Sequence, residues 1–270
     1  MRYPTHEDYC SKLVMHLHHQ VTGSGEPIII LHGLFGSLSN WNSIAKRLSQ
    51  SNTVITVDLR NHGRSEWSDD VSYKAMAFDI AELISHLDLS CPHVVGHSMG
   101  GKTAMTLALE LPDLVKSLIV VDIAPVSYGH SHIDLITTLL SVDLEKIQNR
   151  KDFDSTLEPL ISDAGLRMFL AQNLVRDSSK YHWRINLQAL YSGMSELIGF
   201  PSADGKIYDK PALFVNGALS EYVISKYHPE IYRLFPKAEI STIEGAGHWL
   251  HAEKPKAMIE HTERFINHMV

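Results

Sequence analysis

Short apolar runs alternate with amphipathic segments along most of the chain. Residues 27–31 read Pro-Ile-Ile-Ile-Leu and residues 115–121 are almost as apolar, as expected for strands covered on both faces of a sheet. Between such runs, apolar residues recur at a spacing of three or four, which is typical of amphipathic helices. The pattern predicts a hairpin turn at 22–25, strands at 12–21, 27–31, 53–57, 93–96, 115–121, 211–215 and 238–243, and helices at 40–50, 72–88, 99–111, 225–235 and 255–268.

The pattern changes between residues 126 and 208. Apolar strand runs are absent from this stretch of sequence, which is too long for a loop. Helical spacing is found at 133–140, 144–149, 153–161, 166–175 and 185–197. We therefore expect residues 1–125 and 209–270 to form an α/β core, and residues 126–208 to form a helical cap that has no sheet of its own and is inserted between two core strands.

The order of the elements indicates where a ligand binds. Alternating strands and helices predict a parallel sheet with right-handed crossovers, and such sheets bind ligands at the carboxyl ends of their strands. Asp58 follows one strand in a D-x-x-x-x-G-x-S loop, where we expect it to accept backbone N–H bonds and to be structural. Other polar side chains at these ends are His32, Ser98, Asp122, Ser220 and His248.

A serine stands at the junction of one strand and the next helix. Residues 96–101 read Gly-His-Ser-Met-Gly-Gly. A G-x-S-x-G run at such a junction exposes the hydroxyl on a strained turn, and the glycines keep side chains out of the tight crossing. Ser98 is thus a candidate nucleophile, with a helix-capping serine as the alternative. The N–H group of Met99, which follows Ser98, is a candidate donor to an oxyanion. The N–H group of Leu34, in the glycine loop after the strand 27–31, is a second candidate donor.

Composition narrows the choice of partners and compartment. The chain has 270 residues and a net charge of −7, without a basic block, which argues against nucleic acid or an anionic membrane as the main partner. The two cysteines, Cys10 and Cys91, imply no disulfide framework and fit a reducing cytoplasm. The polar N-terminus is unlike a signal peptide, and no apolar run approaches the ~18 residues of a membrane span. The sequence does not indicate an oligomeric state.

Longer runs extend the pattern around Ser98. They read His-Gly-Leu-Phe-Gly-Ser at 32–37, Val-Asp-Leu-Arg-Asn-His-Gly at 57–63, Asp-Ile-Ala-Pro at 122–125 and Gly-Ala-Gly-His-Trp-Leu-His-Ala-Glu-Lys-Pro at 245–255. With the chain order Ser, Asp, His, the sequence resembles the α/β-hydrolase superfamily over nearly its whole length, and more narrowly the small bacterial esterases of the YbfF type. The resemblance implies an α/β-hydrolase fold with a mostly parallel eight-stranded sheet, no cofactor or metal, and hydrolysis of small carboxylic esters or of acyl thioesters such as acyl-CoA.

A serine hydrolase needs a base and an acid beside its nucleophile. His248, on a glycine-rich loop, is the best base; its rivals are His32, His62, His97 and His251. In most relatives the acid follows the penultimate strand, but residues 216–221 contain no Asp, and Ser220 stands about where it would be. We assign Asp122, at the end of the preceding strand, with Ser220 as a supporting hydroxyl. Glu221 is the alternative acid, and a turn-forming role is the alternative for Asp122.

The cap is expected to line the acyl pocket. The aromatic candidates are Tyr128, Phe169, Trp183, Tyr191 and Trp249, with packing inside the cap as the alternative for each. Arg184 is a candidate for an anionic acyl group or a coenzyme A phosphate, or else a surface arginine. A cofactor-free perhydrolase, a C–C bond hydrolase and a non-enzymatic scaffold remain alternative functions. A dehalogenase is disfavoured because the residue at the strand-to-helix junction is Ser98 rather than Asp.

Overall fold

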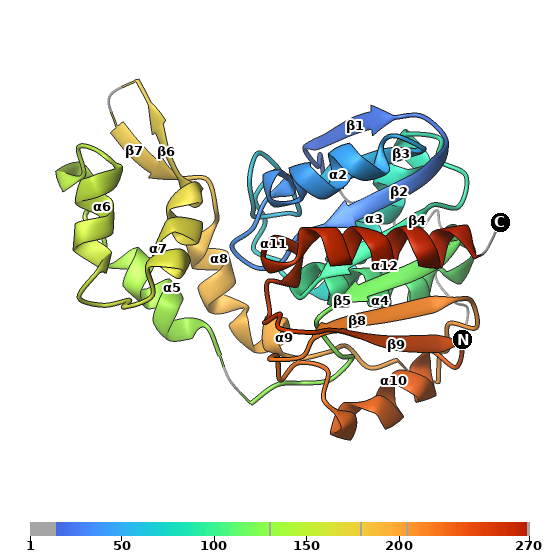
Figure 1. Ribbon diagram of the computed structural model, residues 1–270. Coiled ribbons are helices and arrows are strands. Elements are labelled where there is room, and N and C mark those ends of the chain that lie inside the picture. Colours follow the sequence, from blue (N-terminus) through green and yellow to red (C-terminus); the bar gives the residue numbers. More distant parts are fainter. Residues whose placement is uncertain (1–14, 130, 179, 204, 269–270) are drawn as a thin grey trace, which may run out of the picture.

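A seven-stranded sheet forms the centre of the computed structural model, which describes residues 15–129, 131–178, 180–203 and 205–268 (Figure 1). Its strand order is β1-β3-β2-β4-β5-β8-β9, and only β1 runs antiparallel to its neighbour. This confirms the α/β-hydrolase fold, but the eight strands implied by the resemblance are seven in the described residues. The strands are β1 (His19–Gly23), β2 (Glu26–Leu31), β3 (Asn52–Val57), β4 (His93–His97), β5 (Ser117–Val121), β8 (Ala212–Gly217) and β9 (Ala238–Ile243).

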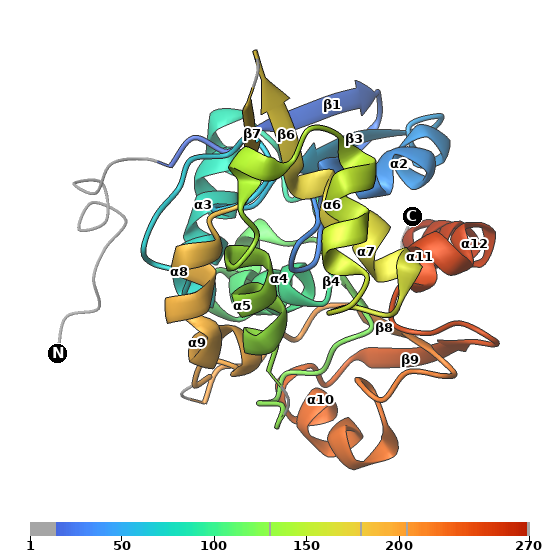
Figure 2. The same ribbon diagram turned by 90° about the vertical axis from the view of Figure 1, so that its left-hand side faces the viewer.

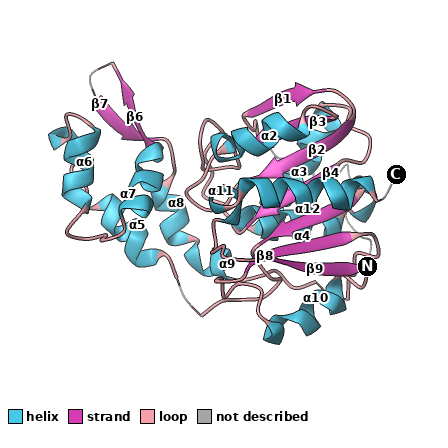
Figure 3. Ribbon diagram, viewed as in Figure 1, coloured by secondary structure: helices cyan, strands magenta, loops and turns pink. Residues whose placement is uncertain are grey.

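Helices cover both faces of this sheet (Figure 3). Because side chains alternate along a strand, Ile29 and Leu31 pack into the cluster that contains α3, α4 and α10, whereas Ile28 and Ile30 pack with α2 and α12. Burial on both faces explains why apolar residues follow one another without alternation in these strands, as at residues 28–31 of β2 and 118–121 of β5. The helices are α2 (Asn42–Leu48), α3 (Tyr73–His86), α4 (Met99–Glu110), α10 (His228–Leu234), α11 (Leu250–Glu253) and α12 (Pro255–Asn267).

The first predicted strand and its turn need correction. Residues 12–14 of the predicted strand lie outside the described residues, and the observed strand is His19–Gly23. It does not form a hairpin with β2, since it pairs antiparallel with β3. The residues of β1 are mostly exposed, so its place at the sheet edge is set by backbone pairing and not by an apolar pattern.

The segment between β5 and β8 forms a separate layer beside the carboxyl ends of the core strands (Figures 1 and 2). It is not purely helical as predicted, because Leu174–Asp177 and Lys180–Trp183 form an antiparallel two-stranded sheet. The stretch 144–149 contains only a short 3-10 turn, Leu144–Lys146, and the predicted helix at 185–197 is two helices that meet at Gly193. The elements are α5 (Ile133–Leu140), α6 (Arg150–Leu157), α7 (Ala164–Leu170), β6 (Leu174–Asp177), β7 (Lys180–Trp183), α8 (Leu187–Ser192) and α9 (Met194–Ile198).

Hydrogen bonds tie this inserted layer to the core. The Asn173 amide donates to the Phe35 carbonyl oxygen over 2.7 Å. The Tyr73 hydroxyl, from α3, donates to the Leu197 carbonyl oxygen over 2.6 Å. Both bonds are buried, so they hold the layer against the loop after β2 and against the start of α3.

Candidate active site

The turn between β4 and α4 holds Ser98 in a strained conformation. Ser98 has φ 51° and ψ −115°, a region that residues with a Cβ rarely adopt. A Cβ at Gly96 would lie 2.2 Å from the Gly100 carbonyl oxygen, and one at Gly100 would lie 2.6 Å from the Leu31 carbonyl oxygen. Only glycine fits at both positions, so the G-x-S-x-G run is the steric requirement of this crossing.

Ser98 does not act as a helix cap. It stands at the N-cap position of α4, yet within the described residues its side chain makes no capping hydrogen bond. Ser72, at the N-cap of α3, behaves differently and accepts a bond from the Ala75 N–H over 3.2 Å. The Ser98 hydroxyl is therefore not used by the helix and is half-exposed toward two cavities.

Asp122 and His248 form a carboxylate–imidazole pair. His248 Nδ1 lies 2.7 Å from Asp122 Oδ2, across 126 residues of sequence. Asp122 is fully buried, while the His248 side chain is 21% exposed. A buried carboxylate that accepts from one ring nitrogen fixes the tautomer and orientation of the ring and leaves the other nitrogen for proton transfer.

The remaining bonds of Asp122 explain why the sheet brings it to this place. Its backbone N–H donates to the Val215 carbonyl oxygen at the end of β8, and its Oδ1 accepts from the Gly217 N–H over 3.0 Å. The Ser220 hydroxyl donates to Oδ2, the oxygen that also faces His248. Glu221, the alternative acid, is exposed.

Asp58 is bound as a structural residue. Its Oδ1 accepts from the Leu38 N–H over 2.8 Å and its Oδ2 from the Arg64 N–H over 3.0 Å. These bonds join the loop after β2 to the loop after β3. Asp58 thus positions the loop that carries Leu34 instead of pairing with His248.

The rival histidines are buried and engaged elsewhere. His32 Nε2 accepts from the Leu59 N–H while its Nδ1 faces the Gly33 carbonyl oxygen, and His62 Nδ1 faces the Arg60 carbonyl oxygen. Burial lowers the pKa of His32 to about 4 and those of His62 and His251 to about 3. Burial also holds the pKa of His97 well below its usual value. His32, His97 and His251 line the same cavity as Ser98 and His248, but of the five candidates His248 is the one with a carboxylate partner in the described structure.

These buried histidines make folding stability depend on pH. A histidine in an unfolded chain has a pKa of about 6.5, whereas the pKa values of His32, His62 and His251 in the folded chain are about 4, 3 and 3, so these rings stay neutral down to lower pH. Below ~6.5 the unfolded chain binds protons that the folded chain does not. The free energy of unfolding should therefore fall between pH 7 and pH 5, by up to about 1.4 kcal/mol per pH unit for each such histidine. Urea unfolding at pH 7, 6 and 5 measures this slope; His62→Asn should reduce it by about one proton, and an unaltered slope would contradict the assignment.

Two cavities meet at Ser98. The larger, of about 130 Å³, is lined by Ser98, His248 and Leu34 on the core side and by Phe169 of the inserted layer. The smaller, of about 40 Å³, is lined by Ser98, Met99, Leu34 and Lys102. Met99 is the first residue of α4, where a backbone N–H has no acceptor within the helix. Both candidate oxyanion donors thus lie beside the nucleophile candidate.

The structure brings some of the predicted substrate-binding residues to these cavities and leaves others away from them. Phe169 and Trp249 line the larger cavity with ring centroids 6.1 Å apart. Trp183 packs edge-on against Phe153 at 5.6 Å inside the inserted layer. Tyr191 is exposed, and Arg184 is half-buried with its backbone N–H on the Asn173 carbonyl oxygen. None of these last three is on the wall of either cavity.

Two residues near the site were missed by sequence reasoning. Tyr222 stacks on the His248 ring, with centroids 4.2 Å apart and planes inclined by 28°. Lys102 is almost fully buried in α4, four residues after Ser98. Its signal was available, because Lys102 is the sole charged residue between Met99 and Leu109.

Neither a metal site nor a membrane span is found in the described ranges. No three His, Cys, Asp or Glu side chains gather there in a way that would hold a metal ion. None of the helices in the same residues combines the length and the apolar character needed to cross a bilayer.

Comparisons with known proteins agree with this geometry. A family model described as the alpha/beta hydrolase fold matches residues 26–255. The mouse protein named sn-1-specific diacylglycerol lipase ABHD11 is 44% identical over 247 residues, covering 88% of this chain and 80% of that protein. Esterase YbfF of Escherichia coli K12 is 34% identical over 245 residues, covering 90% and 94%. A solved structure of a marine microorganism esterase aligns with a TM-score of 0.90 and 42% identity, covering 93% of this chain and 99% of that one. The resemblance seen in the sequence runs is thus confirmed, and the chain belongs to the α/β-hydrolase family.

Proposed function

We propose that the protein is a serine hydrolase that cleaves carboxylic esters or acyl thioesters through an acyl-enzyme on Ser98. The observation that carries this proposal is the buried Asp122–His248 pair, which shares a cavity with an uncapped serine on a strained turn. Ester cleavage is also the activity that the names of the similar esterases and lipases have in common. A cytoplasmic location stays an expectation from the cysteine content.

Each group has a defined task in this reaction. His248 takes the Ser98 proton as the hydroxyl oxygen attacks the carbonyl carbon, and Asp122 stabilises the resulting imidazolium. The N–H groups of Leu34 and Met99 donate to the oxyanion of the tetrahedral intermediate. His248 then protonates the leaving alcohol or thiol. Water, activated by His248 in the same way, attacks the acyl-enzyme, which releases the acid and restores Ser98.

The test is hydrolysis of 4-nitrophenyl acetate and butyrate, together with labelling by a fluorophosphonate probe. We expect turnover of both esters and one label per chain on Ser98. A protein that neither turns over the esters nor reacts with the probe would be a non-enzymatic scaffold. Labelling without ester turnover would favour the perhydrolase or C–C hydrolase alternative.

The position of the His248 ring indicates which cavity receives the leaving group. Because this ring must protonate the leaving atom, the alcohol or thiol departs into the larger cavity, which His248 lines with Phe169 and Trp249. The acyl group then occupies the smaller cavity beside Met99. The inserted layer lines this acyl side too, through Met194, Leu197 and Ile198, so it faces both the acyl group and the leaving group.

Phe169→Ala should change the preference for the alcohol. Removing a half-buried ring that faces Trp249 widens the larger cavity, so the kcat/KM ratio of octyl to ethyl acetate should rise by about tenfold. A pH-stat assay on a series of alkyl acetates measures it. Trp183→Ala is the matched control: its ring packs on Phe153, so it should lower stability without altering the ratio. The same shift in both variants would count against this assignment.

A further inference from the structure

A buried lysine lines the smaller cavity together with the nucleophile candidate. Lys102 lies in the first turns of α4, and the i, i+4 spacing puts it on the same helix face as Ser98, about one turn away. The residue is 2% exposed, and both side chains line this cavity. A short acyl group attached to Ser98 would therefore extend toward the lysine.

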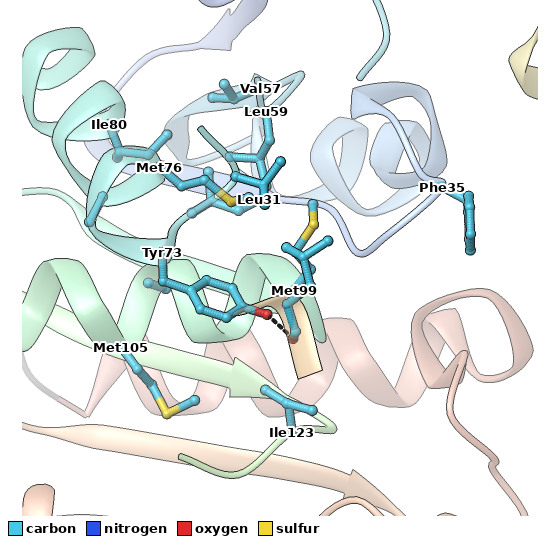
Figure 4. Packing of buried hydrophobic residues seen from close by; sticks show 14 of the residues in the cluster. Leu31, Phe35, Val57, Leu59, Tyr73, Met76, Ile80, Met99, Met105 and Ile123 are labelled. Atoms are coloured by element: carbon cyan, nitrogen blue, oxygen red, sulfur yellow. Dashed lines mark hydrogen bonds between the residues drawn. The ribbon is translucent and has the colours of Figure 1, made fainter. Parts of the chain in front are cut away.

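The ammonium group of Lys102 lies among residues that line this cavity. Nζ lies 4.9 Å from the Tyr128 ring centroid and 5.7 Å from that of Tyr73, and both rings line the cavity. Nζ donates over 2.9 Å to the carbonyl oxygen of Ile198, another lining residue, and also to that of Gly199. Figure 4 shows the Tyr73 ring reaching from α3 toward Met99, at the start of the helix that carries Lys102.

This cation has no anionic partner of its own. Among the described residues no Asp or Glu forms an ion pair with Lys102, and two neutral carbonyls are its hydrogen-bond acceptors. Burial therefore lowers the pKa of Lys102 to about 7. A buried ammonium that lacks a counter-ion is costly, and an anion placed beside it relieves that cost.

We propose that Lys102 selects substrates whose acyl group ends in a carboxylate, so that the enzyme hydrolyses half-esters or half-thioesters of short dicarboxylic acids. This inference rests on the proposed function and specifies its substrate class. The volume of about 40 Å³ and the single helical turn between Ser98 and Lys102 fit a carboxylate two or three carbons from the ester carbonyl. As described above, Ser98 displaces the alcohol from the ester carbonyl carbon, and water then cleaves the acyl-enzyme to release the free dicarboxylic acid and restore Ser98.

The test compares monoethyl succinate with ethyl 4-methylpentanoate, which has an isopropyl group where the succinate has its carboxylate. The wild-type protein should have the higher kcat/KM for the succinate. Lys102→Met should lower the succinate to 4-methylpentanoate ratio by about 30-fold or more. The control is Lys210→Met, because Lys210 Nζ also donates to two carbonyl oxygens, those of Pro112 and Val115, but at the other end of the sheet. That variant should keep the wild-type ratio.

Several results would overturn the proposal. One is a wild-type kcat/KM that is higher for the neutral ester. Another is a Lys102→Met variant whose kcat/KM falls equally on both esters, because the lysine would then only connect α4 to α9 structurally. Calorimetric titration with succinate covers the case in which no ester is hydrolysed: binding by the wild type but not by Lys102→Met would retain the carboxylate subsite and reject ester hydrolysis. If Lys102→Met does not fold, a wild type that does not bind succinate still refutes the subsite.

Discussion

Ser98→Ala should lower kcat for 4-nitrophenyl butyrate by about 10⁴-fold or more, because no other hydroxyl in the site replaces the nucleophile. The fluorophosphonate label should disappear with it. The substitution should hardly affect stability, since the Ser98 side chain caps no helix N–H in the described residues and is half-exposed. Steady-state assays and thermal unfolding measure the two effects.

Ser72→Ala is the matched control for this substitution. Ser72 is also an N-cap serine, but its oxygen accepts from the Ala75 N–H, so the variant should lose about 1 kcal/mol of stability and keep its activity and label. The two serines should thus show opposite effects. If Ser98→Ala retains a tenth of wild-type kcat, Ser98 is not the nucleophile.

The core could be predicted from the sequence because its signals are local and strong. Residues 28–31 of β2 and 118–121 of β5 are all apolar, since both faces of these strands are buried there, and the turn between β4 and α4 needs glycine at positions 96 and 100 for steric reasons. Weaker patterns in the inserted layer led to the wrong prediction of a purely helical segment. Residues 174–177 and 180–183 are half exposed and half buried or intermediate, and they mix charged with aromatic side chains. Neither helical nor strand periodicity stands out in them, and the antiparallel pairing of β6 with β7 decides their structure.

The part of the site that could be predicted is the part that depends on the ends of the strands and on the order of residues along the chain. They place Ser98, Asp122 and His248 at one edge of the sheet. The stacking of Tyr222 on His248 and the walls of the two cavities depend on how the inserted layer and the loop after β8 pack. Side-chain direction within the inserted layer decides the rest. Trp183, at the end of β7, and Phe169, in α7, are both aromatic, but only Phe169 lines a cavity with Ser98.

Asp122→Asn should lower kcat by about 10⁴-fold while the protein stays folded. The amide oxygen of Asn can still accept from the Gly217 N–H. Its NH₂ group, however, would face His248 Nδ1, which lies 2.7 Å from the present carboxylate oxygen. Nδ1 would then have to be the acceptor, so that the proton moves to the nitrogen that should take it from Ser98. The imidazolium would also lose its buried counter-charge.

Two neighbouring substitutions separate the role of Asp122 from those of nearby groups. Ser220→Ala removes one donor to the Asp122 carboxylate and should cost about tenfold in kcat, because the Gly217 N–H and His248 still hold it. Glu221→Gln should have little effect, since this side chain is exposed. Measuring kcat of the three variants on one ester, with thermal unfolding as the check on folding, decides the order. If Glu221→Gln is crippled while Asp122→Asn is near wild type, the acid follows β8 rather than β5, and the 2.7 Å contact between Asp122 and His248 has only a structural role.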